Sequence, residues 1–157
     1  MNPKTTPGSA TMEAASIRLI QSDTEVAECY PLMRQLRPHL KSELEFVERW
    51  KRQAGTGYRL SASWLHTKPV ALAGYRISEN LIYGLHLYVD DLVTDAETRG
   101  QGHGGALLSH LKAEAATRGC TRLVLDSGMA NSLGHRFYFR QGLLAEALHF
   151  TSRVISA

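Results

Sequence analysis

The chain has 157 residues, 43% of them hydrophobic and 21% charged, and a net charge of +3 with neutral histidines. These values suit one globular domain with a single core. The basic residues are not clustered as nucleic-acid binding requires, and the mild excess of charge fits an anionic ligand such as a phosphorylated cofactor. No apolar run reaches the roughly 18 residues of a membrane helix. We therefore expect a cytoplasmic protein that binds neither nucleic acid nor membrane.

The sequence also predicts the extent of the domain, the state of its cysteines and whether it binds a metal. Residues 1–16 are rich in small and polar side chains and predict a flexible N-terminal tail, so that the domain spans 17–157. Cys29 and Cys120 lie far apart, which is typical of reduced thiols in a cytosolic protein. The seven histidines show no metal-ligand spacing, and we expect no metal.

The first third of the chain predicts a short strand and then a helix. The strand covers residues 17–20, and Ser22 or Asp23 can cap the helix that follows. Pro31 weakens or kinks this helix, and Pro38 ends it.

A second helix is predicted to begin at Ser42. Glu45 follows this serine by three residues, which is the spacing of a capping box. Leu44, Val47 and Trp50 form the expected apolar stripe, and a glycine ends the helix.

Three strand-like segments come next, at 58–65, 69–77 and 81–93. The predicted turns between them lie at 66–68 and 78–80. Because these connections are short, the three strands should form an antiparallel meander.

The rest of the chain alternates helices and strands. We expect a helix at 106–118, a buried strand at 121–126, a short helix that Asn131 or Ser132 caps, and a strand-rich tail at 143–155. This order predicts an α+β domain with a mixed, mostly antiparallel central sheet flanked by helices.

One glycine-rich turn between a strand and a helix carries the strongest chemical signal. It comprises Arg99, Gly100, Gln101, Gly102, His103, Gly104 and Gly105. Glycines let the backbone approach a ligand, and the amides at a helix N-terminus lack internal partners and lie at the positive end of the dipole. Together these features predict a site for a phosphate or pyrophosphate, to which Arg99 adds a charged contact.

Two other phosphate-binding loops fit the turn less well. A Walker-type loop ends in Gly-Lys-Ser/Thr, which is absent here. The dinucleotide fingerprint has a different glycine spacing and follows the first strand of a βαβ unit, whereas this turn follows antiparallel strands in mid-chain.

Two patterns resemble the signatures of the GNAT family of N-acetyltransferases. The first signature, Gln/Arg-x-x-Gly-x-Gly/Ala, is matched by Arg99, Gly102 and Gly104. The second, Phe-Tyr-x-x-x-Gly-Phe, resembles residues 137–143, with Leu143 in place of the last phenylalanine. The resemblance covers most of the chain and implies a single GNAT-like domain.

The resemblance also implies that the chain binds acetyl-CoA. The amides of residues 101–105 would hold the pyrophosphate, and the main chain of a strand would meet the pantetheine arm like an added strand. That strand segment comprises Leu92, Val93 and Thr94. Asn131 would contact the pantetheine, and Tyr138 would stand near the sulfur.

Transfer of an acyl group from a thioester to an amine needs a neutral amine and a proton for the departing thiolate. An amine with a pKa of about 10.4 is neutral in roughly 1 molecule in 2,500 at pH 7, and making it neutral costs about 4.6 kcal/mol. Tyr138 is the candidate acid.

Asp90 and Asp91 are the candidate bases. Neighbouring strand residues face opposite sides, so we expect only one of the two at the site. By the resemblance, Asp90 takes the place of a glutamate that acts on the amine through water. The alternative is that both aspartates dock the substrate without proton transfer.

The sequence thus predicts an acetyl-CoA-dependent N-acetyltransferase. The expected acceptor is a primary amine of a small molecule (a polyamine, an amino acid or a drug-like amine) that attacks in a ternary complex, with a peptide or protein amine as the alternative. Other hypotheses are a non-catalytic acyl-CoA sensor or interaction module of the same fold, and a protein with another acyl donor or phosphate ligand. Because dimers are common in the family, we also consider a homodimer whose C-terminal strands pair across subunits.

Overall fold

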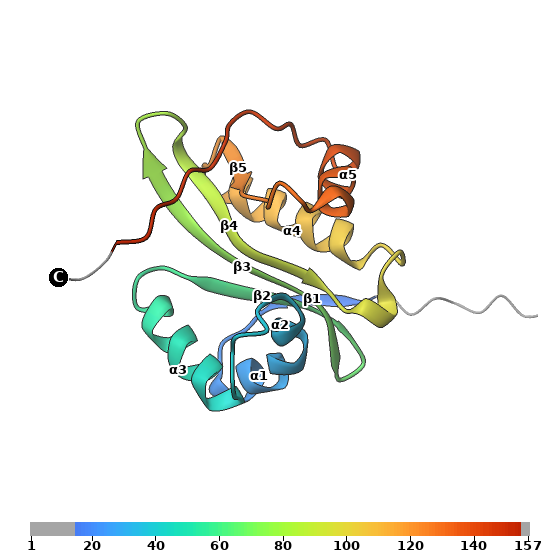
Figure 1. Ribbon diagram of the computed structural model, residues 1–157. Coiled ribbons are helices and arrows are strands. Elements are labelled where there is room, and N and C mark those ends of the chain that lie inside the picture. Colours follow the sequence, from blue (N-terminus) through green and yellow to red (C-terminus); the bar gives the residue numbers. More distant parts are fainter. Residues whose placement is uncertain (1–14, 155–157) are drawn as a thin grey trace, which may run out of the picture.

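A computed structural model describes residues 15–154, and these form a three-layered α+β arrangement (Figure 1). Five strands lie in one sheet in the order β1-β2-β3-β4-β5. They are β1 (Ser16–Leu19), β2 (Arg59–Leu65), β3 (Lys68–Asn80), β4 (Gly84–Thr94) and β5 (Arg122–Leu125). The first four are antiparallel, and β5 runs parallel to β4. This mixed, mostly antiparallel sheet confirms the predicted fold class, including the meander of β2, β3 and β4.

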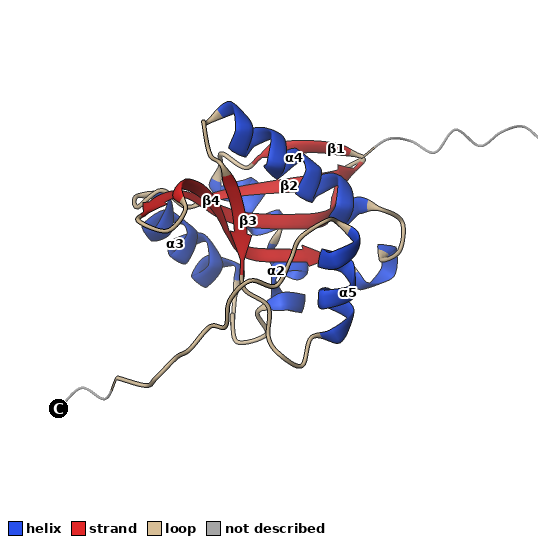
Figure 2. Cartoon of the chain, turned by 90° about the horizontal axis from the view of Figure 1, so that it is seen from above, coloured by secondary structure: helices blue, strands red, loops and turns tan. Residues whose placement is uncertain are grey.

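Helices cover both faces of the sheet (Figures 1 and 2). One face carries α1 (Asp23–Glu28), α2 (Tyr30–Leu36) and α3 (Glu43–Ala54). The other face carries α4 (His103–Thr117), with α5 (Ser132–Arg140) beside it. No helix in the described part of the chain is long and apolar enough to cross a membrane. Nearly all of the predicted 1–16 tail lies outside the described residues, and Ser16 already belongs to β1.

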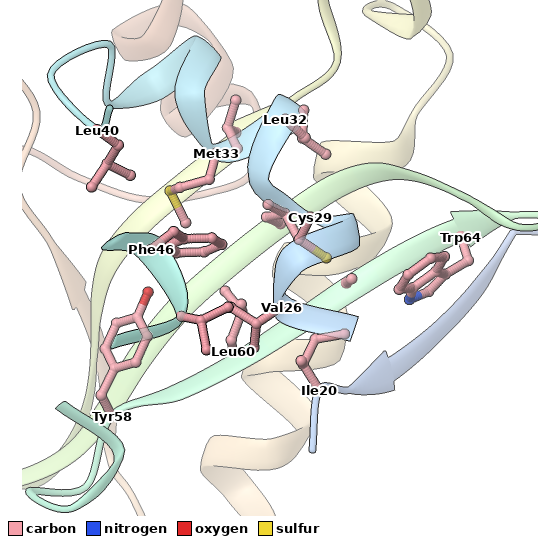
Figure 3. Close-up of a cluster of buried hydrophobic side chains, with 14 residues drawn as sticks. Ile20, Val26, Cys29, Leu32, Met33, Leu40, Phe46, Tyr58, Leu60 and Trp64 are labelled. Carbon is pink, nitrogen blue, oxygen red and sulfur yellow. The ribbon is translucent and has the colours of Figure 1, made fainter. Parts of the chain in front are cut away.

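Each face of the sheet buries an apolar cluster. The cluster under α1, α2 and α3 includes Val26, Cys29 and Leu60, each with no exposed surface (Figure 3). The cluster under α4 includes Leu107 and Leu111, likewise fully buried. Full burial of such a side chain contributes roughly 1.5–3 kcal/mol. Burial also raises the pKa of the Cys29 thiol to about 12, so this cysteine stays protonated.

The first predicted helix is in fact two, α1 and α2, which meet at Cys29. Ser22 caps α1, with Glu25 completing a capping box. Pro31 lies in the first turn of α2, where its missing N–H has no helical partner to lose. The proline therefore starts a new helix where the sequence predicted a kink.

Ser42 caps α3 as predicted, because its hydroxyl accepts from the amide of Glu45. The predicted apolar stripe was wrong at Leu44, which is 67% exposed. The buried side chains are Phe46 and Val47, with Trp50 packed against them. Leu44 lies two residues, or about 200°, before Phe46 on the helix, and so faces the opposite side.

The turn between β3 and β4 lies at residues 81–83, and not at 78–80 as predicted. The side-chain oxygen of Asn80 accepts from the amides of Ile82 (3.0 Å) and Tyr83 (2.7 Å). Asn80 thus begins the turn as the last residue of β3.

The C-terminal prediction was also wrong, because residues 143–154 contain no strand. Leu144, Leu148, Phe150 and Val154 are 66–93% exposed and face no sheet. The predicted buried strand at 121–126 is β5, and its residues are half-buried or exposed. β5 is the edge strand, so no strand among the described residues pairs with its outer side.

Candidate functional site

The glycine-rich turn forms the start of α4, three residues earlier than predicted. Gly100 and Gly102 have φ values of 81° and 89°, a region that glycine adopts without strain. The first amide with a helical partner is that of Ala106, which donates to the carbonyl of Gly102. Among the described residues, the amides of 102–105 have no acceptor. Four amide donors are therefore free at the positive end of the α4 dipole.

Close packing holds this end of α4 in place. A Cβ on Gly104 would lie 2.9 Å from the Oγ1 of Thr94 and 3.5 Å from the ring of Phe137. Only glycine lets the helix approach β4 and α5 so closely. The Nε2 of His103 is buried and has no partner among the described residues, which is costly unless a ligand supplies one.

Asp95, which the sequence analysis did not single out, anchors the strand-to-turn connection. It caps the short 3-10 helix η1 (Ala96–Thr98) and is only 4% exposed. Its carboxylate accepts from Lys68 (2.9 Å) and from Gln35 (3.0 Å). Lys68 and then Gln35 lower the pKa of Asp95, so it remains ionised in the folded protein.

The far end of β4 has an open edge. Pairing with β5 covers only the segment from His86 to Val89. Beyond it, Leu92, Val93 and Thr94 pair with β3 on one side only. Val93 is buried under α1–α3 and Leu92 packs toward α4, so both side chains hold the strand in place. The main chain of this segment can accept an extended ligand as an added strand.

A β-bulge in β4 decides where the two aspartates point. Gly74 pairs with Asp91 and Tyr75 pairs with Val89, so Asp90 is the extra residue. A bulge interrupts the alternation of side chains along a strand. The strict alternation on which we expected only one of Asp90 and Asp91 at the site therefore does not hold here, and which of the two meets the acceptor stays a prediction.

Both carboxylates belong to one charged cluster, and each has an arginine. Asp91 accepts from Arg37 (2.7 Å) and from the hydroxyl of Tyr58 (2.8 Å). Asp90 accepts from Arg76 at 3.0 Å, and the Arg76 guanidinium stacks 5.3 Å over the Tyr58 ring. The cluster thus joins the residue after α2 and the residue before β2 to β3 and β4.

Burial raises the pKa of two groups in this cluster, Asp90 and Tyr58. Burial raises the pKa of the Asp90 carboxyl, and the nearby Arg76 only partly offsets this effect. Burial, followed by the charge of Asp91, raises the pKa of Tyr58 well above its ordinary value. Asp90 is thus a stronger base than an ordinary aspartate, while Tyr58 keeps its proton.

No sequence pattern marked Arg37, Tyr58 or Arg76 as partners of the two aspartates. None of them belongs to a local motif, and Arg37 lies 54 positions from Asp91. No signal in a single sequence pairs residues so far apart.

Two predicted site residues lie on or beside α5. Tyr138 is half-buried, contacts Phe137 edge-on at 5.4 Å, and its hydroxyl bonds to no group among residues 15–154. Burial raises the pKa of Tyr138, which favours the protonated form that an acid needs. Asn131 caps α5, because its Oδ1 accepts from the amide of Gly134 at 3.1 Å. Its contact with a cofactor stays a prediction.

No group of three histidine, cysteine, aspartate or glutamate side chains among the described residues could hold a metal ion.

Comparisons with known proteins place the chain in a family. The Acetyltransferase (GNAT) family model matches residues 24–143. A relative from Bacillus subtilis (strain 168), the uncharacterized N-acetyltransferase YhdJ, is 32% identical over 139 residues, which are 88% of this chain and 98% of that protein.

Solved structures share the fold at lower identity. AAC(6')-Iy in complex with the bisubstrate analog CoA-S-monomethyl-acetylneamine has a TM-score of 0.79 at 13% identity, over 91% of this chain and 100% of that one. Ribosomal-protein-alanine N-acetyltransferase from Brucella melitensis biovar Abortus 2308 has a TM-score of 0.71 at 22% identity, over 92% and 99%. The family match and the Bacillus relative together identify this chain as an acetyltransferase of the GNAT family.

Proposed function

We propose that this acetyltransferase takes its acetyl group from acetyl-CoA and passes it to a primary amine of a small molecule in a ternary complex. The observation that carries the proposal is the set of four free amides at 102–105 beside the open edge of β4. The GNAT family uses acetyl-CoA, and these two features suit its two parts: an anionic diphosphate and an extended amide-bearing arm.

Each part of the cofactor has its own group of residues in this proposal. The amides of 102–105 hold the pyrophosphate, whereas the expected amide of Gln101 already donates to the carbonyl of Thr98 at 3.4 Å. The buried Nε2 of His103, which has no partner among the described residues, is free to bond to the cofactor. Arg99 and Gly100 flank these amides. The main chain of 92–94 and the Asn131 amide border the pantetheine arm.

The catalytic roles follow from the environments of three side chains. Acetyl-CoA supplies the thioester that is cleaved. Tyr138 holds a proton on Oη for the departing thiolate, because no protein group competes for that hydroxyl among residues 15–154. Asp90 and Asp91 bind the acceptor amine, and Asp90, made more basic by burial, is one group that can take the amine's proton, directly or through water.

The environment of the aspartates favours a compact acceptor. The side chain of Asp91 is 14% exposed and that of Asp90 is 30% exposed, and guanidinium groups from α2 and β3 cover them. The solved relatives include AAC(6')-Iy with its bisubstrate analog and a ribosomal-protein-alanine N-acetyltransferase, so the shared fold alone leaves a peptide amine as an alternative.

A panel of acceptors tests the proposal. The protein is incubated with acetyl-CoA and with polyamines, amino acids, aminoglycosides and N-terminal peptides, and free thiol is measured. Thiol release with small amines supports the proposal, and release with peptides alone supports the protein-amine alternative. Thermal stabilisation by CoA without thiol release on any amine would identify a non-catalytic sensor.

We also propose one domain over 17–157, a homodimer and a cytoplasmic location. The exposed apolar side chains of Leu144, Leu148, Phe150 and Val154 supply a surface for a second copy. The free cysteines suit a reducing compartment. Light scattering of the native chain and of Phe150→Glu tests the dimer, since a dimer built on this tail should dissociate in the variant.

A further inference from the structure

A second carboxylate centre lies where β4 and β5 separate. Their parallel pairing ends at Val89 and Leu125, and Asp126 is the next residue along the chain. The hydroxyl of Tyr88 donates to Oδ2 of Asp126. The Nδ1 of His149 lies 2.9 Å from the same oxygen. One carboxylate oxygen therefore joins β4, the end of β5 and the C-terminal tail.

This centre adjoins the charged cluster of the site. Tyr88 is the pairing partner of Arg76, whose guanidinium holds Asp90. Burial, then the hydrogen bond to Asp126 and to a smaller extent the charge of Asp90, raises the pKa of Tyr88, so the tyrosine keeps its proton. The same fork ends the open edge along which the proposed pantetheine arm would lie, so the thioester of a bound cofactor would be directed toward this end of β5.

The two carboxylate centres differ in their partners. Asp90 and Asp91 each face an arginine, whose charge is permanent. Asp126 faces a tyrosine hydroxyl and an imidazole, the side chain whose ordinary titration falls near neutral pH. The side chain of His149 is 60% exposed, so its ring is open to a substrate. Arg122 and Glu146, 3.6 Å apart, hold the tail against β5 nearby.

We propose that His149, oriented by Asp126, is the base that deprotonates the acceptor amine. This inference rests on the proposed function and assigns to His149 the proton transfer for which Asp90 is the other candidate, so that Asp90 and Asp91 only bind the amine. With the proton on Nδ1 donated to Asp126, Nε2 presents a free lone pair. An N–H bond of the ammonium group breaks, an Nε2–H bond forms, and the carboxylate stabilises the resulting imidazolium. The proton then leaves to water, and Asp126 acts as a positioning residue.

Because the C-terminal tail carries His149, the tail is part of the active site in this proposal. In Figure 1 the tail leaves α5 and returns past the β5 end of the sheet. Its links to β5, through Glu146 and His149, are side-chain contacts. A tail without secondary structure thus carries a reactive group back to the fork.

Kinetics on the whole chain test the inference. His149→Ala should lower kcat for the best amine by about 100-fold or more, leave CoA affinity unchanged, and regain activity when imidazole is added. His110→Ala, on α4, is the matched control and should behave as wild type. Undiminished turnover of His149→Ala, or a loss that imidazole does not restore, would overturn the inference.

A variant of the carboxylate tests the pairing separately. Asp126→Asn should lower kcat for the same amine by about 10-fold or more, because the amide no longer orients the ring or stabilises the imidazolium. CoA affinity and the thermal unfolding midpoint should stay unchanged, which separates a positioning role from a structural one. Wild-type turnover of Asp126→Asn would overturn the pairing. A wild type that releases no thiol with any amine refutes the proposed function as a whole, whereas an active His149→Ala enzyme refutes only the base.

Discussion

Replacing Gly102 with valine tests the phosphate-binding turn most directly. Gly102 has a φ of 89°, and a Cβ there would meet no atom within 4 Å. The effect is therefore backbone strain without a clash. An L-residue in the left-handed region costs about 1–2 kcal/mol, and a β-branched one more. The turn should relieve this strain by rotating, which moves the free amides that follow it.

The expected loss of CoA affinity follows from those amides. A hydrogen bond to a charged group contributes about 1.5 kcal/mol at the lower end of its range. Two displaced amides would then cost about 3 kcal/mol, which is a rise of about 100-fold in the Kd of CoA. Isothermal titration calorimetry measures this change.

Gly119 offers a matched control at the other end of α4. Its φ is 74°, and a Cβ there also meets nothing within 4 Å. Gly119→Val should lower thermal stability by a similar amount, a few degrees, and leave the Kd of CoA unchanged. Equal CoA affinities for Gly102→Val and wild type would refute the placement of the pyrophosphate.

Three further predictions concern other parts of the chain. Tyr138→Phe should lower kcat at least 100-fold in the thiol-release assay with the Kd of CoA unchanged, and an equal loss of affinity would contradict the acid role. Asp95→Asn should lower the free energy of unfolding, measured with urea at pH 7, by about 1–3 kcal/mol. Because the folded-state pKa of Asp95 is below its ordinary value of 3.8, this stabilisation is full above that value and lost as the pH falls through the folded pKa, so the two proteins should converge in acid. In the same assay, Phe46→Ala should lower the free energy of unfolding by about 3–5 kcal/mol and Leu44→Ala by under about 0.5 kcal/mol. Comparable losses in the two variants would contradict the burial of Phe46 and the exposure of Leu44 on α3.

Local chemistry determined much of the fold from the sequence alone. Ser22 and Ser42 predicted helix starts because a cap needs only the next three residues. The glycines around Gly102 marked the strand-to-helix turn because their backbone freedom is intrinsic. The antiparallel meander followed from short connections and the period of two.

The tertiary structure decided the chemistry around β4. The bulge at Asp90 depends on how β4 pairs with β3, and a single strand's pattern does not show it. The arginine partners of the two aspartates come from distant parts of the chain, so only folding brings these charges together.

The C-terminal tail also shows that tertiary contacts decide what the local sequence does not. Its apolar residues predicted strands, but a strand exists only where another backbone supplies hydrogen-bond partners, and residues 143–154 have none among the described strands. The sequence by itself determined the elements whose stabilising contacts lie within a few residues: caps, turns and the glycine-rich start of α4. Strand partners, the bulge and the charge pairs at Asp90, Asp91 and Asp126 depend on contacts between distant residues, and only the tertiary structure decided them.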